Sequence, residues 1–424
     1  MSSTIAYQGN CPTQCNTCTD VQLEVYITDL PAREMMNTII HQVYIPALKS
    51  YYPSGYDEMR GIADGADVTL EDIVLLNSRY DLARLGDDGA TRPVNGHHQH
   101  DPEGAEETAN ECTSAFFPQE STANNDVLVA QNWDMSSRLW ENDCVIYLEV
   151  HPDPSENKPS LFMVTEAGQL GRSGMSSAGI GVAANSLMSS EDYVPVPYVD
   201  AGGQLHDRQV QKILPISMLR RMILESNHLA EALTAAYNFP RHVSNNLTIG
   251  TAEGFGLCLE VTPQTIFKVY KSNRDNYLVH GNHFVHPGFL SRSGLSCKYP
   301  GGSSWFRQRR LEALVQTSAQ EGTITQDSII EALSDHLSFP ESLCVHPDRN
   351  PIDAVIRHLP GYPFRGISAT IACVMYNLTK REVTVCSGPP CQGTFQTFQL
   401  HGPSGNRLGV SVKATQNGVR PERP

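Results

Sequence analysis

The chain has 424 residues, with 31 Lys and Arg against 46 Asp and Glu, and a formal net charge of -15 at pH 7. This length is enough for one large domain or two modest ones. The acidic balance argues against nucleic acid or an anionic membrane as the main partner, because both are bound through basic surfaces.

The ends of the sequence carry no recognisable targeting signal. The start lacks the basic and apolar regions of a secretory signal peptide, and no apolar run approaches the roughly 20 residues that span a bilayer. The C-terminal RPERP is not a peroxisomal address of the Ser-Lys-Leu type. We therefore expect a cytoplasmic protein whose 11 cysteines are mostly reduced.

The N-terminal quarter of the chain predicts helices. The first twenty residues look irregular, residues 32–51 place apolar side chains at helical spacing, and residues 55–68 continue the pattern. Residues 69–85 predict a further helix, with Thr69 as a plausible N-cap and Asp72 three residues later. No strand signal is strong before residue 112, and the Gly-, Pro- and acid-rich residues 86–111 predict a linker.

After residue 112 the pattern changes to β-branched and aromatic runs that predict strands, interrupted twice by pairs of helices. The predicted strands lie at residues 112–118, 126–134, 143–152, 160–168, 176–187, 246–250, 256–263, 266–272, 369–377 and 381–388. The predicted helices lie at residues 214–226, 229–239, 304–318 and 326–337. This order is typical of a layered α+β fold and not of regular βαβ alternation.

Cys112 stands where the acidic linker meets the first strand. A buried, inert thiol is the ordinary interpretation of any single cysteine. A catalytic role requires a base, and no Cys-His motif is obvious nearby. If the bond before Cys112 is cut, however, the residue gains an α-amino group that titrates near neutrality. One residue then supplies both nucleophile and base, which is the logic of N-terminal nucleophile catalysis.

Three further polar residues are candidates for the same site. Antiparallel pairing of strands 112–118 and 127–134 would place Asp134 near Cys112. Asn185 and Asn282 carry amides that can donate to a developing oxyanion. Taken alone, Asp134 is a strand-end cap and the two asparagines are turn residues.

The sequence resembles the acyl-coenzyme A:isopenicillin N acyltransferase family, a branch of the N-terminal nucleophile hydrolases. The resemblance covers roughly residues 50 to 380 and is carried, in family order, by YDEMRGIADGADVTLEDIVLLNSR, ECTSAF, AQNWD, VTEAGQLGRSGMSSAGIGVAANSL, HGNH, SSWFRQRRLE and SLCVHPD. ECTSAF followed at this distance by QNWD is the specific signal.

The resemblance implies a four-layer αββα sandwich that is made as an inactive precursor. Self-cleavage between Glu111 and Cys112 would give an α subunit, residues 1–111, and a β subunit, residues 112–424, within one αββα domain. The two chains would stay associated. The mature protein would acylate or hydrolyse amides through a thioester.

The resemblance also implies roles for the four candidate residues. Cys112 is similar to the family nucleophile, and Asp134 to the partner of its amine. Asn185 and Asn282 match positions that orient the nucleophile and stabilise the oxyanion. Asn77 and Arg79 match a helix near the pocket without an assigned role.

Some positions depart from the penicillin enzyme. Glu111 replaces a glycine before the nucleophile, and Ile367 replaces an active-site arginine, with Arg365 two residues earlier. The peroxisomal tail is also absent. These departures argue against penicillin formation by this chain more than they argue against thioester chemistry.

Three hypotheses of function follow from these observations. The first is an acyltransferase of secondary metabolism that passes an acyl group from acyl-CoA, as co-substrate, or from an amide to an amine. The second is a hydrolase of small amides or peptides at the same site. The third is an unprocessed, inactive relative with a binding role. None of them requires a cofactor.

Other reactive residues have ordinary interpretations. Cys11, Cys15 and Cys18 have a spacing used for iron–sulfur or zinc ligation, but an irregular N-terminal tail is the simpler interpretation, as a solvated linker is for His97, His98 and His100. We therefore expect no metal. The arginines of FRQRRLE predict a solvated helix face. Core or turn thiols are expected for the remaining cysteines, Cys144, Cys258, Cys297, Cys344, Cys373, Cys386 and Cys391.

Overall fold

The structure is a computed structural model. It describes residues 4–8, 30–83, 112–200, 203–272, 274–299, 302–347 and 368–400. Within these ranges, no helix combines the length and the apolarity needed to span a membrane.

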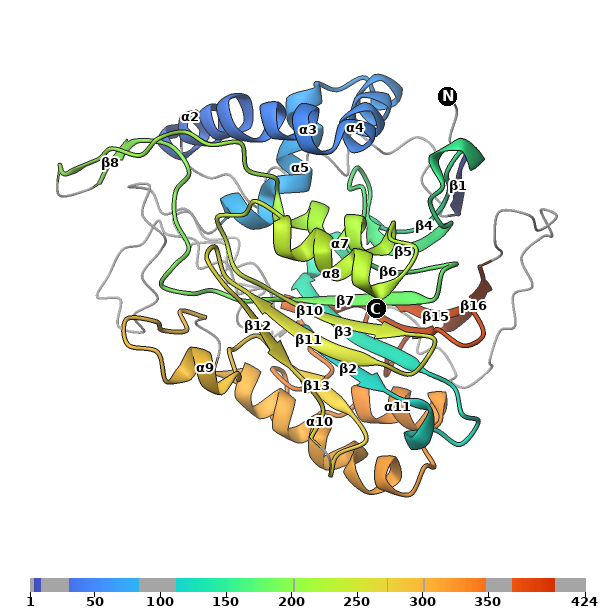
Figure 1. The fold of residues 1–424 in the computed structure, drawn as a ribbon. Coiled ribbons are helices and arrows are strands. Elements are labelled where there is room, and N and C mark those ends of the chain that lie inside the picture. Colours follow the sequence, from blue (N-terminus) through green and yellow to red (C-terminus); the bar gives the residue numbers. More distant parts are fainter. Residues whose placement is uncertain are drawn as a thin grey trace, which may run out of the picture.

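Two antiparallel sheets form the centre of the molecule (Figure 1). The eight-stranded sheet has the spatial order β1 (Thr4–Gln8), β4 (Val145–His151), β5 (Leu161–Glu166), β6 (Ser173–Ser176), β7 (Ile180–Ser186), β10 (Asn245–Thr251), β11 (Gly256–Val261) and β12 (Ile266–Val269). The six-stranded sheet has the order β13 (Leu278–His280), β2 (Cys112–Phe117), β3 (Leu128–Ser136), β14 (Ser368–Asn377), β15 (Glu382–Ser387) and β16 (Phe395–Gln399). A separate hairpin pairs β8 (Tyr198–Val199) with β9 (Leu205–His206).

Helices cover the outer face of each sheet (Figure 1). The eight-stranded sheet is covered by α2 (Leu30–Ile39), a π-helical turn (Ile40–Tyr44), α3 (Ile45–Tyr51), α4 (Pro53–Ala66), α5 (Leu70–Leu82), α7 (Ile216–Leu224) and α8 (Leu229–Asn238). The six-stranded sheet is covered by α10 (Ser303–Gln320) and α11 (Gln326–Leu333). Short helices α6 (Ser137–Glu141) and α9 (Pro287–Leu290) lie in connections. The predicted four-layer αββα sandwich is confirmed.

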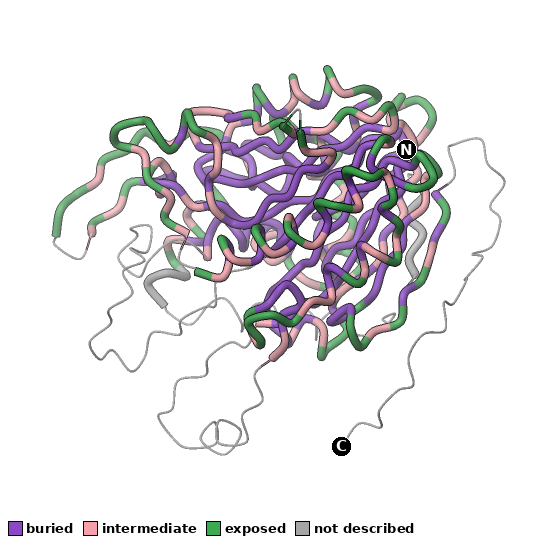
Figure 2. Tube along the Cα trace, turned by 90° about the horizontal axis from the view of Figure 1, so that it is seen from below, coloured by how far each residue is buried: buried purple, intermediate pink, exposed green. Residues whose placement is uncertain are grey.

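Three apolar cores separate the four layers, so the central strands are buried on both faces, whereas β4, β12 and β16 also carry partly exposed or exposed residues. On β2, Phe116 packs into the core between the sheets, whereas Ala115 and Phe117 pack into the core beneath α10 and α11. Successive side chains of a strand point to opposite faces. This explains why β2 and β3 are continuous buried runs. Figure 2 shows the buried residues, in purple, gathered in the interior of the molecule.

Two local predictions are confirmed at residue level. The N-cap of α5 is Thr69, whose hydroxyl oxygen accepts from the N–H of Asp72 at 3.2 Å while the Asp72 carboxylate accepts from the Thr69 N–H at 3.0 Å. Strands β2 and β3 pair antiparallel, with Cys112 opposite Trp133. Asp134 is the next residue of β3 after the one that faces the cysteine.

Besides β6, β8, β9 and β16, two strands at sheet edges were not predicted from the sequence. Residues 4–8, expected to be irregular, form β1, which pairs with β4 at the edge of the large sheet. Residues 278–280 form β13, which pairs with β2 at the edge of the small sheet. Both strands are short and pair with a partner distant in the chain, so neither produces a local periodic signal.

Candidate active site

Cys112 begins β2, and its side chain lies in the core between the two sheets. The residue is fully buried. Its backbone nitrogen donates to Asn282 Oδ1 at 2.9 Å, and its carbonyl oxygen accepts from Arg307 Nη1 at 2.8 Å. The backbone of the proposed nucleophile is therefore fixed on both sides.

The thiol of Cys112 faces groups that act on its ionisation in opposite directions. Burial raises its pKa, and the Asp134 carboxylate adds to this effect. The Arg172 guanidinium, with Nη2 at 3.9 Å from Sγ, lowers it, as do the backbone N–H of Asp134 and the charge of Arg307. The net direction is upward, so the thiol favours its protonated form.

Arg172 was not identified from the sequence. It follows β5 and is almost fully buried, with its guanidinium carbon 4.3 Å from the centre of the Trp133 ring. Its Nη1 lies 3.9 Å from Glu166 Oε1, and the same carboxylate oxygen pairs with Arg79 Nη2 from α5. Helix α5 therefore contacts, through Arg79, the Glu166 carboxylate that also pairs with Arg172 beside the thiol. The motif residue Arg79 thus lies next to the site.

Asp134 lies on β3, fully buried and opposite Thr370 of β14. Thr370 Oγ1 donates to Asp134 Oδ1 at 2.6 Å. Asp134 approaches the Cys112 thiol through its own backbone N–H. The acceptor for the Cys112 nitrogen is the Asn282 side chain, a different residue from the amine partner that the family resemblance implies.

Asn282 follows β13 and joins the elements of the site. Its Oδ1 accepts from Arg307 Nη2 at 2.8 Å as well as from the Cys112 nitrogen. Its Nδ2 donates to the carbonyl of Ser186 at 3.1 Å, and its backbone N–H donates to Ser304 Oγ at 2.7 Å. Both ends of the amide are therefore oriented.

Asn185, on β7, connects the two sheets behind the nucleophile. Its Nδ2 donates to the carbonyl oxygens of His280 at 2.7 Å and Gly281 at 2.9 Å, and to Ser114 Oγ at 2.9 Å. Its Oδ1 accepts from Gln131 Nε2 at 3.0 Å. These contacts fix β2 and the segment before Asn282 relative to β7.

Arg307 corrects the prediction that the FRQRRLE arginines form a solvated helix face. Arg307 is 0% exposed, whereas the side chain of Arg309 is 82% exposed. Ser304, Arg307 and Leu311 share the buried face of α10, at the three- and four-residue spacing of one helix side. That spacing in the sequence was a signal that could have identified Arg307.

A buried acid behind the site fixes the segment from His280 to His286. Glu260 Oε1 lies 2.9 Å from His280 Nε2 and accepts from the N–H of Val285 at 2.6 Å. In the same segment, His283 Nδ1 lies 2.8 Å from Ser304 Oγ. Burial and neighbouring cations lower the pKa of His283 to about 3, so it is neutral near physiological pH.

Several sequence candidates lie outside the described residues. They are Glu111, Cys11, Cys15, Cys18, His97, His98, His100, Arg365 and Ile367. Of the bond between Glu111 and Cys112, at which the resemblance implies self-cleavage, only the Cys112 side lies among the described residues.

A cysteine that opens a strand inside an αββα sandwich, with amide and guanidinium groups around it, defines the class: the fold is that of the N-terminal nucleophile hydrolases. Residues 121–392, more than half of the chain, match the sequence model of the acyl-coenzyme A:6-aminopenicillanic acid acyl-transferase family. The chain belongs to this family, which confirms the resemblance. Asp134, Asn185, Asn282 and Arg307 lie within the matched range, and Cys112 precedes it.

Individual relatives agree with this assignment. The chain is 27% identical over 299 residues to the 40 kDa form of acyl-coenzyme A:6-aminopenicillanic-acid-acyltransferase from Emericella nidulans, covering 70% of this chain and 68% of that protein. The chain is thus an enzyme that acts on C–N bonds, an acyltransferase or amidohydrolase.

Solved structures show weaker likeness. A variant of conjugated bile acid hydrolase from Clostridium perfringens aligns with a TM-score of 0.43 and 11% identity, over 73% of this chain and 97% of that chain. Penicillin V acylase from Agrobacterium tumefaciens aligns with a TM-score of 0.35 and 13% identity, over 72% and 98%. The fold assignment rests on the sheets of this chain and on its family.

Proposed function

We propose that the chain is a self-processing acyltransferase that carries an acyl group on Cys112 as a thioester. The observation that carries the proposal is the position of Cys112 at the start of β2. Its thiol lies 3.9 Å from Arg172, and its nitrogen is held at 2.9 Å by Asn282. A nucleophile and a future amine base are thereby oriented in one residue.

Maturation would begin with the Cys112 thiol. The sulfur adds to the carbonyl carbon of Glu111, the C–N bond to Cys112 breaks, and the thiol proton goes to the departing amine. Water then hydrolyses the thioester, which frees the Glu111 carboxylate and restores the thiol. The nitrogen that donates to Asn282 Oδ1 in the uncut chain becomes the free amine.

In the mature enzyme, the amine would take the thiol proton and the thiolate would attack an acyl donor. Asn282, with a backbone N–H, would stabilise the oxyanion, and the leaving CoA thiolate or amine would accept the proton. An amine acceptor would then attack the carbonyl carbon of the acyl-cysteine, the C–S bond would break, and the proton lost by the amine would restore the Cys112 thiol. Asp134 beside the thiol would stabilise the protonated amine, Arg172 the thiolate, and Arg307 would hold Asn282 in place.

The proposed substrates are a small amide or an acyl-CoA as donor and a small amine as acceptor. The acyl-CoA donor is supported by the name of the Emericella nidulans relative, and a role in secondary metabolism is part of the proposal. The steps above use protein groups and substrates only, so the proposal includes no cofactor. A cytoplasmic location, and partners limited to small molecules and the two cleaved chains, are part of the same proposal.

The first test is intact-mass analysis of freshly purified protein beside the Cys112→Ala variant. We expect the wild type to give two chains, residues 1–111 and 112–424, and the variant to stay whole. Cys258→Ala is the matched control, because this fully buried thiol packs in the same core between the sheets and should not affect cleavage. A full-length chain in both the wild type and Cys258→Ala contradicts self-processing and favours an inactive binding relative.

The second test separates transfer from hydrolysis. Release of CoA from acyl-CoA is followed with and without a panel of amines, using processed enzyme. Faster release with an amine, together with formation of the amide, supports the acyltransferase. Equal release in both cases, with free acid as the product, shows that water and not an amine takes the acyl group, and release of amine and acid from a small amide then indicates the amidohydrolase alternative.

A further inference from the structure

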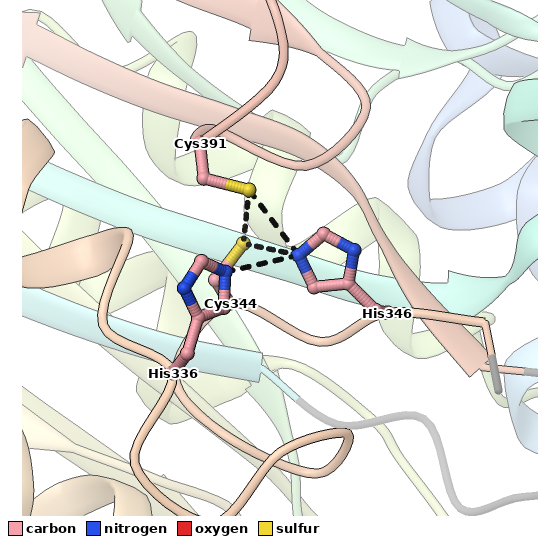
Figure 3. Close-up of side chains that lie close together, drawn as sticks. All are labelled: His336, Cys344, His346 and Cys391. Atoms are coloured by element: carbon pink, nitrogen blue, oxygen red, sulfur yellow. Dashed lines mark hydrogen bonds between the residues drawn. The ribbon is translucent and has the colours of Figure 1, made fainter. Parts of the chain in front are cut away.

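Four side chains outside the active site converge on one point (Figure 3). They are His336, Cys344, His346 and Cys391, and their nearest nitrogen and sulfur atoms all lie within 4.8 Å of one another. His336, Cys344 and His346 come from the segment after α11, and Cys391 from the turn after β15. Two chain segments far apart in the sequence thus meet through these four side chains.

The distances around His346 Nε2 are short. This nitrogen lies 3.1 Å from His336 Nε2, 3.3 Å from Cys344 Sγ and 3.2 Å from Cys391 Sγ. The two sulfurs are 3.6 Å apart. A ring nitrogen has either one lone pair or one hydrogen, so His346 Nε2 cannot satisfy three such neighbours at once.

A single cation at the centre would satisfy all four groups. In tetrahedral zinc sites with Zn–S of about 2.3 Å and Zn–N of about 2.0 to 2.1 Å, neighbouring ligand atoms are roughly 3.3 to 3.8 Å apart. The three distances from His346 Nε2 and the distance between the two sulfurs lie within a few tenths of an ångström of that range. We propose that His336, Cys344, His346 and Cys391 form a structural zinc site.

The chemistry of the donor set favours zinc over other divalent ions. Two thiolates and two imidazoles in a tetrahedral arrangement suit Zn²⁺, whereas Mg²⁺ and Ca²⁺ prefer oxygen ligands. On binding, each thiol loses one proton, and the two thiolates balance the two positive charges of the ion. Four protein ligands fill the coordination shell, so the site has a structural role and does not activate water.

The position of the cluster links the zinc site to the candidate active site. Between two of the ligands, Val345 donates its N–H to Thr370 Oγ1 at 2.9 Å and accepts from the Thr370 N–H at 3.0 Å. Thr370 Oγ1 in turn donates to Asp134 Oδ1 at 2.6 Å. The metal would therefore hold the segment around Val345 against the six-stranded sheet, where its contact with Thr370 supports Asp134. This departs from the expectation that Cys344 and Cys391 are plain core or turn thiols.

The test is the metal content of reduced wild-type protein, purified without chelator and then incubated with zinc chloride and desalted. We expect about one zinc per chain, the stoichiometry of a four-ligand site. Cys344→Ser, Cys391→Ser and His346→Ala should bind zinc at least tenfold more weakly in competition with a chromophoric chelator. Cys297→Ser is the matched control, because this half-buried cysteine lies outside the cluster and should leave the affinity unchanged.

Two further measurements keep the proposal falsifiable. Cobalt substitution should give the absorption of tetrahedral thiolate-bound Co²⁺ in the wild type and lose it in Cys391→Ser. A chelator should lower the Tm of the wild type and leave that of Cys391→Ser unchanged, because the exposed His336 and Cys391 make the site accessible.

Folded, reduced wild-type protein that binds no zinc after incubation would overturn the proposal. So would zinc binding that survives all three ligand variants. A Cys344–Cys391 disulfide in protein that cannot be loaded after reduction would instead assign the pair to redox chemistry. None of these measurements uses a substrate, so the zinc site and the proposed enzymatic function stand or fail separately.

Discussion

At the scale of single residues, Arg172 is the charge that most favours the Cys112 thiolate. Its Nη2 lies 3.9 Å from Sγ, and it lowers the pKa of the thiol against the effect of burial. Replacing it by Met should raise that pKa, so the pH midpoint of Cys112 alkylation by iodoacetamide should move upward. At pH 7 we expect alkylation to slow by on the order of tenfold, because the lost attraction acts between charges about 4 Å apart in a buried site.

Arg172→Lys is the control for this prediction, because it keeps the positive charge while losing the guanidinium contact over the Trp133 ring. Alkylation of the Lys variant should stay closer to wild type than that of the Met variant. The reaction is followed by peptide mapping at Cys112, which distinguishes it from the other cysteines. Equal rates for wild type and Met variant would show that Arg172 does not act on the thiol.

Thr370 makes a second prediction at this scale. Its hydroxyl donates to Asp134 Oδ1 at 2.6 Å and accepts from the Val345 N–H at 2.9 Å. Thr370→Val keeps the shape but removes both hydrogen bonds, and a buried polar group left without its partner costs about 1 to 3 kcal/mol. We expect a lower Tm for the Val variant in thermal unfolding, while Thr370→Ser, which retains the hydroxyl, should remain near wild type. Unchanged Tm values for both variants would mean that this contact contributes nothing to stability.

At the scale of elements, one face of α10 contacts the candidate site and the opposite face is exposed to solvent. Arg307 donates to the carbonyl of Cys112 and to Asn282 Oδ1, each at 2.8 Å. Removing one partner of a buried, charge-assisted contact leaves the other groups unpaired. We expect Arg307→Gln to slow formation of the 1–111 and 112–424 chains by about 10²-fold or more, as loss of a positioned donor does in related chemistry.

Arg309→Gln provides the matched control, because it makes the same substitution two residues along the same helix, where the side chain is 82% exposed. Cleavage is timed by gel densitometry during expression and after purification. Circular dichroism of both variants separates a loss of positioning from a loss of folding. Normal cleavage by a folded Arg307→Gln protein would remove Arg307 from the mechanism.

The elements also show what the sequence can and cannot reveal. The β2–β3 hairpin was predictable, because strand runs and spacing placed Asp134 next to Cys112. Strand β13 was not, since three residues paired with a distant strand leave no periodic pattern. The three- and four-residue spacing of Ser304, Arg307 and Leu311 indicates the buried face of α10, but the neighbouring arginines favoured a solvated face instead. The four clustered His and Cys side chains lie on segments that only the folded sheet brings together.

At the scale of the whole molecule, the N-terminal helices are part of the core and not an appendage. Side chains of α2–α5 and of the eight-stranded sheet share one apolar cluster. Polar contacts add to it: the Asn77 side chain accepts from the Leu170 N–H at 2.9 Å, and Tyr52 donates to Glu225 Oε1 at 2.7 Å. After cleavage, residues 1–111 should therefore remain bound to residues 112–424 on size exclusion at neutral pH.

The association should weaken in acid, and Glu225 supplies the reason. Burial opposes its ionisation, but Arg221, Lys158 and the hydrogen bond from Tyr52, which lies in the 1–111 chain, outweigh burial and lower the pKa of its carboxyl below the usual range. A group whose pKa is lowered by folding stabilises the folded state above its unfolded pKa, about 4.3 for Glu, and loses that contribution as pH falls through the lowered value.

Size exclusion and native mass spectrometry from pH 7 down to 3 should show the two chains separating at the acidic end. Glu225→Gln, which keeps an acceptor for Tyr52 but cannot titrate, should be less stable at pH 7 and should separate with a shallower pH dependence. If the variant and the wild type separate over the same pH range, the acid sensitivity belongs to other carboxylates.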